Sequence, residues 1–352
     1  DPAQTDDDFP SKQFNTVLYT GNSTNGHAIS NLGFKPDMVW IKRRDYTGSY
    51  NQGIIDSSRG ATKGLYSPRT DAEANFTNDF ASFDSDGFTL NAGSSMNINN
   101  SSSTFVAWCW RANGGTTASN SDGSITSTVQ ANTKAGFSIV TYTGNATNGA
   151  TFGHGLSAKP SFVIIKNRDA SQKWAVWHQS ADMTDYKLLF LNANSSLTTE
   201  GTQRWDVSAI SSSVFGLGSH PEINGSGADY VSYIWHDVEG MQKFGTFTGN
   251  GSTDGPFIYT GFRPRMVCIK GVDEAYSWFV FDSARNTFNL VDKHVRWDGT
   301  DAEATEPTGA RRVDFLSNGF KIRASAASLN GNNDTYVYMA WGDVPFKYNN
   351  TF

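Results

Sequence analysis

The chain has little that would cross-link it. Only two of its 352 residues are cysteine, Cys109 and Cys268, and each lies inside a strand-like apolar run. A disulfide needs Cα atoms within about 7 Å of each other, and these two cysteines occupy different places in different repeats. We therefore expect two buried thiols and no bridge, so stability must come from packing or from assembly.

Long apolar runs and basic runs are also missing. No apolar segment approaches the roughly 18–20 residues that a membrane helix needs, so membrane insertion is not expected. The 28 basic and 34 acidic residues are spread along the chain and give a net charge of -6. Without a basic run to follow a phosphate backbone, nucleic acid is not an expected partner. The polar, acidic start at Asp1 indicates a processed or trimmed chain.

Helical periodicity is absent as well, because no window keeps apolar residues at i, i+3, i+4 and i+7 over three turns. The chain instead has 34 glycines, many Ser, Thr and Asn, and 13% aromatic residues. Gly and Asn favour turns, and large rings bury much apolar area in small cores. This composition predicts many short strands joined by turns, with helices short or absent.

One stretch occurs three times. Gly33–Lys42 has its counterparts in Leu156–Lys166 and Gly261–Lys270, and each copy is a proline-fixed bend, an apolar run and a lysine. Successive copies lie much further apart along the chain than the about 20–50 residues of a solenoid unit, so the repeating unit is a whole small domain. We predict that each copy is the central strand of one sandwich, with its lysine at the exit toward solvent.

Other landmarks recur in step with this stretch. A Thr-Gly-Asn turn opens each repeat, and Asp-Gly or Asn-Gly hairpins follow in the first and third repeats. Each repeat closes on an aromatic strand: Thr104–Trp110, Tyr230–Trp235 and Tyr336–Trp341. The spacing predicts three tandem jelly-roll or lectin-like β-sandwich repeats of about 100 residues each.

The predicted divisions are an arm at 1–13, repeat 1 at 14–112, a Gly/Ser/Thr-rich connector at 113–134, repeat 2 at 135–240 and repeat 3 at 241–352. Within the connector, Gly123–Val129 is a candidate for one extra strand.

The titratable residues show no catalytic grouping. The six histidines lack metal-ligand spacing, and neither a nucleophile elbow nor a phosphate-binding loop is present. Asp56 and Asp282 correspond, but repeat 2 has His178 there, and no repeat shows a convincing pair of carboxylates for glycoside cleavage. We expect no catalytic residues, metal or cofactor, and hence a protein that is not an enzyme.

Charged residues nevertheless recur after the apolar run. Lys42, Lys166 and Lys270 are each followed three residues later by an aspartate: Asp45, Asp169 and Asp273. One interpretation is a ligand-binding loop stated three times. The other, which we favour, is a lysine that extends to solvent at a strand end beside an aspartate that caps a turn.

The same loops carry aromatic residues. Trp174 and Trp278 are equivalent, and Tyr46, Tyr50 and Tyr276 lie nearby. Exposed rings would stack on sugars, but we favour core packing for the tryptophans and exposure for the tyrosines. Any binding is therefore expected in the loops 45–50, 169–174 and 273–278.

The Tyr-Thr-Gly-Asn turn, the Gly-Phe-x-Pro-x-(Met/Phe)-Val-x-Ile-Lys strand, the Ser-Asp-Gly-Phe hairpin and the closing strand Tyr336–Trp341 resemble modules of tail-fibre-like proteins of marine bacteriophages. The resemblance covers Phe14 to Tyr348. It implies a virion structural protein at the particle surface, most fitting a fibre or host-attachment appendage with lectin-like domains. Its partners would be other virion proteins, further copies of itself (a trimer above all) and a host surface glycan.

Repeat 2 departs most from this pattern, because Leu156-Ser157-Ala158-Lys159 replaces Gly-Phe before the proline. One ligand site shared by all three repeats is therefore in doubt. Two alternatives stay open: a capsid decoration protein in which the repeats tile a surface, and a tailspike that degrades polysaccharide.

Overall fold

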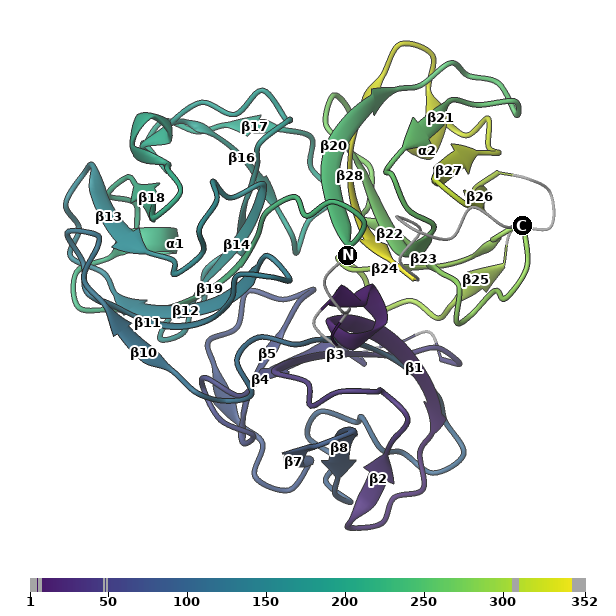
Figure 1. Ribbon diagram of the computed structural model, residues 1–352, viewed down its shortest axis with the longest axis horizontal. Coiled ribbons are helices and arrows are strands. Elements are labelled where there is room, and N and C mark those ends of the chain that lie inside the picture. Colours follow the sequence, from purple (N-terminus) through teal and green to yellow (C-terminus); the bar gives the residue numbers. More distant parts are fainter. Residues whose placement is uncertain (1–4, 6–7, 47, 49, 306–309, 344–352) are drawn as a thin grey trace.

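The computed structural model describes residues 5, 8–46, 48, 50–305 and 310–343. It is an all-β structure whose named strands pair antiparallel, as the sequence predicts. The helices in the described residues are single turns: the 3₁₀ turns η2 (Pro10–Lys12) and η3 (Val207–Ala209) and the α-helical turns α1 (Pro221–Asn224) and α2 (Ala327–Asn330). The strands form three lobes around a common centre (Figure 1).

Lobe 1 combines a large and a small sheet. The large sheet, in the order β1-β9-β3-β4-β5-β6, contains β1 (Phe14–Thr20), β9 (Thr104–Trp110), β3 (Met38–Arg43), β4 (Gly53–Asp56), β5 (Lys63–Tyr66) and β6 (Ala74–Asn75). The small sheet contains β2 (His27–Ile29), β8 (Gly87–Leu90) and β7 (Phe80–Asp84) in that order.

Lobe 3 repeats this topology strand for strand. Its large sheet, in the order β20-β28-β22-β23-β24-β25, contains β20 (Gln242–Thr248), β28 (Thr335–Gly342), β22 (Pro264–Gly271), β23 (Phe279–Asp282), β24 (Lys293–Arg296) and β25 (Ala304–Thr305). The small sheet contains β21 (Phe257–Tyr259), β27 (Gly319–Ile322) and β26 (Val313–Leu316).

Lobe 2 has a larger main sheet. It contains β10 (Ala118–Asn120), β11 (Ser127–Asn132), β12 (Phe137–Thr143), β19 (Asp229–Trp235), β14 (Phe162–Asn167), β15 (Ala175–His178), β16 (Lys187–Phe190) and β17 (Thr198–Thr199) in that order. The small sheet pairs β13 (Ala150–Gly153) with β18 (Val214–Leu217). The connector therefore supplies two strands, β10 and β11, where the sequence suggests one.

The thrice-repeated stretch is an interior strand of each large sheet, as β3, β14 and β22. In β3, Met38 and Trp40 pack into a core between the lobes, whereas Val39 and Ile41 pack into the core of lobe 1 itself. Burial on both faces explains why the stretch is a continuous apolar run without alternation.

The core between the lobes is shared by all three. Its centre is formed by the last aromatic residue of each closing strand, Trp110, Trp235 and Trp341. Their ring centroids lie 5.9 Å (Trp110–Trp235), 5.5 Å (Trp110–Trp341) and 6.0 Å (Trp235–Trp341) apart, at interplanar angles of 64°, 74° and 74°. This mutual edge-to-face packing marks a pseudo-threefold axis, so the repeats form one closed ring.

A buried asparagine holds the opening turn of each lobe. Asn330 Oδ1 accepts a hydrogen bond from the backbone N–H of Asn250 at 2.9 Å, and Asn330 Nδ2 donates to the carbonyl of Ser252 at 2.7 Å. In this turn a Cβ on Gly249 would lie 2.2 Å from the carbonyl oxygen of Gly331, so glycine is required there. The same arrangement, built on Asn99 and Asn224, explains the repeated Thr-Gly-Asn motif in lobes 1 and 2.

Candidate functional site at the seams between the lobes

The loops that follow the repeated strands all lie where one lobe meets the next. We name the three contacts seam 1/2, seam 3/1 and seam 2/3 after the lobes that they join. Each seam is bridged by one equivalent backbone hydrogen bond of 2.8 Å, from Glu73 N to Arg168 O, from Glu303 N to Arg44 O and from Leu197 N to Val272 O. The backbone frame of the ring is therefore the same at all three contacts.

A second contact between lobes is made by the tryptophan that directly precedes β15 in lobe 2 and β23 in lobe 3. Trp174 Nε1 donates to the carbonyl of Tyr66 at 3.0 Å, and Trp278 Nε1 donates to that of Phe190 at 3.0 Å. Both indoles are buried, in agreement with the core interpretation, so neither is available to stack on a ligand. Gln52 replaces them in lobe 1, with its amide bonded to carbonyls of lobe 3.

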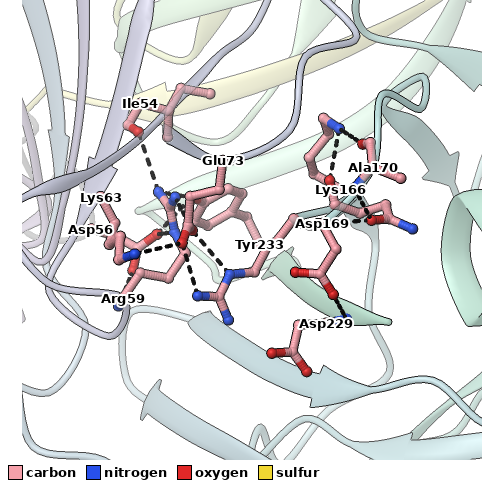
Figure 2. A network of polar contacts seen from close by, with 12 residues as sticks. Ile54, Asp56, Arg59, Lys63, Glu73, Lys166, Asp169, Ala170, Asp229 and Tyr233 are labelled. Carbon is pink, nitrogen blue, oxygen red and sulfur yellow. Dashed lines mark hydrogen bonds and ion pairs between the residues drawn. The ribbon is translucent and has the colours of Figure 1, made fainter. Parts of the chain in front are cut away.

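Seam 1/2 contains a buried ion cluster (Figure 2). The guanidinium of Arg59 bonds Asp56 at 2.5 Å and Glu73 at 2.9 Å, and no part of its side chain is exposed. Lobe 2 completes the cluster, because Arg168 bonds Glu73 at 2.9 Å and the hydroxyl of Tyr233 donates to Asp56 at 2.7 Å. One glutamate thus joins arginines of two lobes.

Seam 3/1 contains the same cluster. Arg285 bonds Asp282 at 2.6 Å and Glu303 at 3.5 Å. Lobe 1 supplies Arg44, whose guanidinium bonds Glu303 at 2.9 Å, and the indole N–H of Trp108, which lies 3.2 Å from Asp282 Oδ2. The two clusters are equivalent residue by residue except that Trp108 replaces a tyrosine.

Glu73 and Arg59 of the cluster at seam 1/2 are held as ions. Burial works against charge on each, yet the hydrogen bonds and charges of Arg168 and Arg59 lower the pKa of Glu73. In the same way the charge of Asp56 raises the pKa of Arg59. Their hydrogen bonds are made within the protein, so the cluster acts as a cross-link between lobes.

The repeated lysines correct one prediction. Lys42, Lys166 and Lys270 do not extend to solvent but are buried at the seams, exposed by 1%, 0% and 0%. Lys166 Nζ donates to the carbonyl of Asn167 at 2.7 Å and Lys270 Nζ to that of Gly271 at 2.6 Å. Burial lowers the pKa of each lysine to about 8. The side chain follows the alternation of its strand into the core between the lobes, which the end of an apolar run did not reveal.

The recurring aspartates are exposed and two of them serve the backbone. Asp169 Oδ2 accepts from the N–H of Asp229 at 2.7 Å, and Asp273 Oδ2 accepts from that of Thr335 at 2.6 Å. Each bonds the first residue of the closing strand of its lobe, 60 or 62 residues further along the chain, rather than the local turn that the favoured interpretation expects. Asp45 differs, because it pairs with Arg43 at 2.7 Å.

The tyrosines of these loops are more exposed than the tryptophans. Tyr46 is 48% exposed, and its ring lies 5.1 Å from that of Tyr50 with the guanidinium of Arg43 over both. Positions 47 and 49 of this loop lie outside the described residues. Tyr276 is half-buried against the core of lobe 3. Because the three loops belong to three different seams, the candidate residues do not meet in one site.

Seam 2/3 lacks the ion cluster. His178 replaces the aspartate, Ala181 the arginine and Leu197 the glutamate, while Val272 stands in place of Arg44 or Arg168. Next to Asp273 the seam opens into a hollow of about 510 Å³, with Ala181, Leu197 and Val272 among its lining residues. The position that holds a buried guanidinium at the other seams is therefore open here.

His178 is neutral at this seam. Burial lowers its pKa to about 4. Its Nδ1 accepts from the backbone N–H of Ser180 at 3.2 Å, which leaves Nε2 as the donor to the carbonyl of Tyr338 at 3.3 Å.

Sequence reasoning missed the arginines of the clusters. The correspondence of Asp56 and Asp282 with His178 was visible, and three residues later Arg59 and Arg285 correspond with Ala181. An aspartate–arginine pair at i, i+3 that disappears as a unit from one repeat was the signal.

Other kinds of site are not seen in the described part of the chain. No three His, Cys, Asp or Glu side chains there are grouped to hold a metal ion. Within the same residues no helix has the length and hydropathy to cross a membrane. Cys109 and Cys268 are free and buried, as the sequence predicts.

A family model described as "Domain of unknown function (DUF7483)" matches residues 9–345. The chain belongs to this family. The match spans all three lobes, so the unit that the family defines is the closed ring rather than a single repeat. No curated protein and no solved structure matches the chain.

Proposed function

We propose that this DUF7483 chain is a non-enzymatic structural module of a phage particle, most fitting a tail fibre or appendage that attaches to a host surface glycan. The observation that carries the proposal is the contact of Trp110, Trp235 and Trp341, which fixes the three lobes about one axis within a single chain. The resemblance of its motifs to those of tail-fibre-like proteins is the reason for placing it in a phage particle.

The ring of three lobes suits this role because its centre is one shared core, whereas its outer strands differ from lobe to lobe. The buried charged residues of the two ion clusters are used to join the lobes at the seams. The exposed loops and the outer sheets are then free to differ from lobe to lobe without loss of the ring.

A threefold frame also suits a threefold partner. Symmetric assemblies present equivalent surfaces about their axes, and a ring of three similar lobes matches the end of a trimeric shaft. The expected self-association of the chain, with a trimer favoured, belongs to this proposal, and sedimentation of the purified chain tests it.

The direct test of the proposal is binding of the purified, labelled chain to an array of bacterial surface glycans and to whole marine bacteria. We expect attachment to some strains and to the glycans extracted from them. If the chain ignores every glycan and every strain but binds purified capsids, the capsid decoration alternative replaces attachment. Release of reducing ends from a bound polysaccharide would instead favour the tailspike alternative.

A further inference from the structure

The outer sheets of the three lobes present different side chains to solvent. In lobe 1, β2 turns the small Ala28 outward. In lobe 2 the equivalent strand is covered by the connector, because Ile125 N donates to the carbonyl of Thr151 at 2.8 Å. In lobe 3, β21 exposes two rings, Phe257 by 45% and Tyr259 by 59% (Figure 1 shows β21 at the rim).

The register makes this comparison specific. Ile29 pairs with Phe88 in lobe 1 as Ile258 pairs with Phe320 in lobe 3. Ser30 in lobe 1 therefore occupies the position that Tyr259 has in lobe 3. Lobe 3 also holds four of the seven exposed large apolar side chains among the described residues, namely Phe257, Tyr259, Phe288 and Leu290. Phe257 and Tyr259 lie two residues apart on β21 and therefore on the same face of the sheet.

Beside Tyr259 the surface is hollowed by about 340 Å³, at the lower end of the range of small-molecule sites. The polar side chains that line this hollow together with the tyrosine are Asp237, Glu239, Gln242, Lys243 and Thr260. The tyrosine ring thus stands beside two carboxylates, an amide, an ammonium and a hydroxyl.

The polar groups of the hollow are held in place by the backbone. Asp237 Oδ1 accepts from the N–H of Phe244 at 2.9 Å, and the amide of Gln242 donates to the carbonyl of His236 at 2.7 Å. The ammonium of Lys243 lies 5.4 Å from the centroid of the Tyr259 ring. Pre-positioned polar groups around an exposed ring lower the ordering cost of binding.

We propose that this hollow is a pyranose-binding site, with Tyr259 packed on the C–H face of the sugar ring and Asp237 and Lys243 bonded to its hydroxyls. A pyranose offers one apolar face and a rim of hydroxyls, which matches a single exposed ring beside a carboxylate and an ammonium. The inference rests on the proposed attachment to host glycans and names the lobe that makes it.

Lobe 1 supplies an internal comparison. Its hollow of about 360 Å³ at Gly33, the counterpart of Gly261, is lined by Lys12 and Lys35 and by the buried Phe34. No exposed ring is among its lining residues. The hollow of lobe 1 therefore lacks the exposed ring that the hollow of lobe 3 has in Tyr259.

The test is titration of the full chain with a panel of methyl pyranosides, followed by NMR or calorimetry. We expect at least one pyranoside to bind, and Tyr259→Ala to weaken that binding about tenfold or more, whereas Tyr259→Phe keeps most of it. Tyr186→Ala is the matched control, because Tyr186 is 44% exposed on lobe 2 and lies outside the hollow. It should bind as the wild type does.

The outcomes separate the site from the function. Binding that Tyr259→Ala leaves unchanged overturns the site, as does failure of the wild type to bind any pyranoside while it still attaches to cells. Pyranoside binding that depends on Tyr259, without attachment to any bacterium, keeps the site and overturns attachment.

Discussion

Seams 1/2 and 2/3 join equivalent lobes through the same backbone hydrogen bond, yet only seam 1/2 holds a buried ion cluster in the described residues. At seam 1/2 a buried guanidinium bonds two carboxylates, whereas at seam 2/3 the same positions hold Ala181, His178 and Leu197. Asp56, Arg59, Glu73 and Arg168 all have uncharged counterparts at seam 2/3, whereas the more exposed Lys63, 3.8 Å from Glu73, keeps its counterpart in Lys187. This agrees with the energetics of buried ions, since loss of one partner is costly and replacement of all partners is not.

The difference shows that the ion clusters do not create the ring. The shared core and the backbone contacts are common to all seams, and they close it with or without charge. Each buried charge at seams 1/2 and 3/1 needs an opposite charge across from it. Seam 2/3 has no such cluster among its described residues and contains a hollow instead. Variants that break or transplant the clusters test this interpretation.

The largest effect is expected for Arg59→Ala. It leaves Asp56 and Glu73 buried without one of their cations, which should lower the free energy of unfolding by about 3–5 kcal/mol. Urea unfolding measures this difference. Arg69→Ala is the control, because the pair with Asp71 is about half exposed and should cost less than about 1 kcal/mol. Similar losses in the two variants would contradict a cross-linking role for the cluster.

A smaller effect, of opposite sign, is expected for Lys42→Met. Lys42 is buried and its ammonium has no hydrogen-bond partner among the described residues, so an apolar side chain of similar shape should raise stability at pH 7 by about 2–3 kcal/mol. The folded pKa of about 8 lies below the usual 10.5. The unfolded chain therefore holds more protons between these values, and the wild type gains stability as pH rises from 8 toward 10.

Unfolding of wild type and Lys42→Met at pH 7 and pH 9.5 measures both effects. The advantage of the variant should shrink at the higher pH. An advantage that stays constant would show that the lysine keeps its charge in the folded protein over this range, which would contradict the lowered pKa.

An acid-dependent loss is expected at the apolar seam. The folded pKa of His178 is lowered from 6.5 to about 4, so the unfolded state binds a proton first as pH falls through 6.5, and stability declines until about pH 4. His178→Gln should remove about 2–3 kcal/mol of this decline. Thermal unfolding of both proteins between pH 7 and 4 measures it, and parallel curves would refute the assignment.

The smallest net effect is expected when the apolar set is transplanted into seam 1/2. The required changes are Asp56→His, Arg59→Ala, Glu73→Leu, Arg168→Val and Tyr233→Met, the last because Met339 is the counterpart of Tyr233 in lobe 3. Because all partners leave together, we expect stability within about 1–2 kcal/mol of the wild type, well above that of Arg59→Ala alone. If the full transplant is as unstable as the single variant, the seams are not interchangeable.

Much of the fold was accessible from the sequence. The apolar run of Gly33–Lys42 indicated a central strand, and the structure shows it inside the large sheet and buried on both faces. Core packing of Trp174 and Trp278 was also predicted correctly. The local sequence pattern was enough to predict these features because strand burial and turn formation depend on residues that are neighbours in the sequence.

Closure of the ring was not accessible in the same way. Trp110, Trp235 and Trp341 look like ordinary core residues of three separate sandwiches, and only the assembled lobes bring them together. The lysines were misplaced for the same reason. A lysine at a strand end normally reaches solvent, and nothing local shows that another lobe covers it.

The candidate site divides likewise. The surface position of Asp169 and Asp273 follows from their place after a strand, but their bonds to residues 60 and 62 positions further on depend on the folded sheet. Tyr259 did not stand out in sequence, because its exposure depends on the strand register and on what the other lobes cover at the same position.

The most direct test of the central claim, that three lobes form one closed unit, is differential scanning calorimetry of the full chain. A shared core predicts a single cooperative transition in which the calorimetric and van't Hoff enthalpies agree. Arg59→Ala should move this whole transition to lower temperature. Two or three separate transitions, with only one shifted by that variant, would contradict the closed ring.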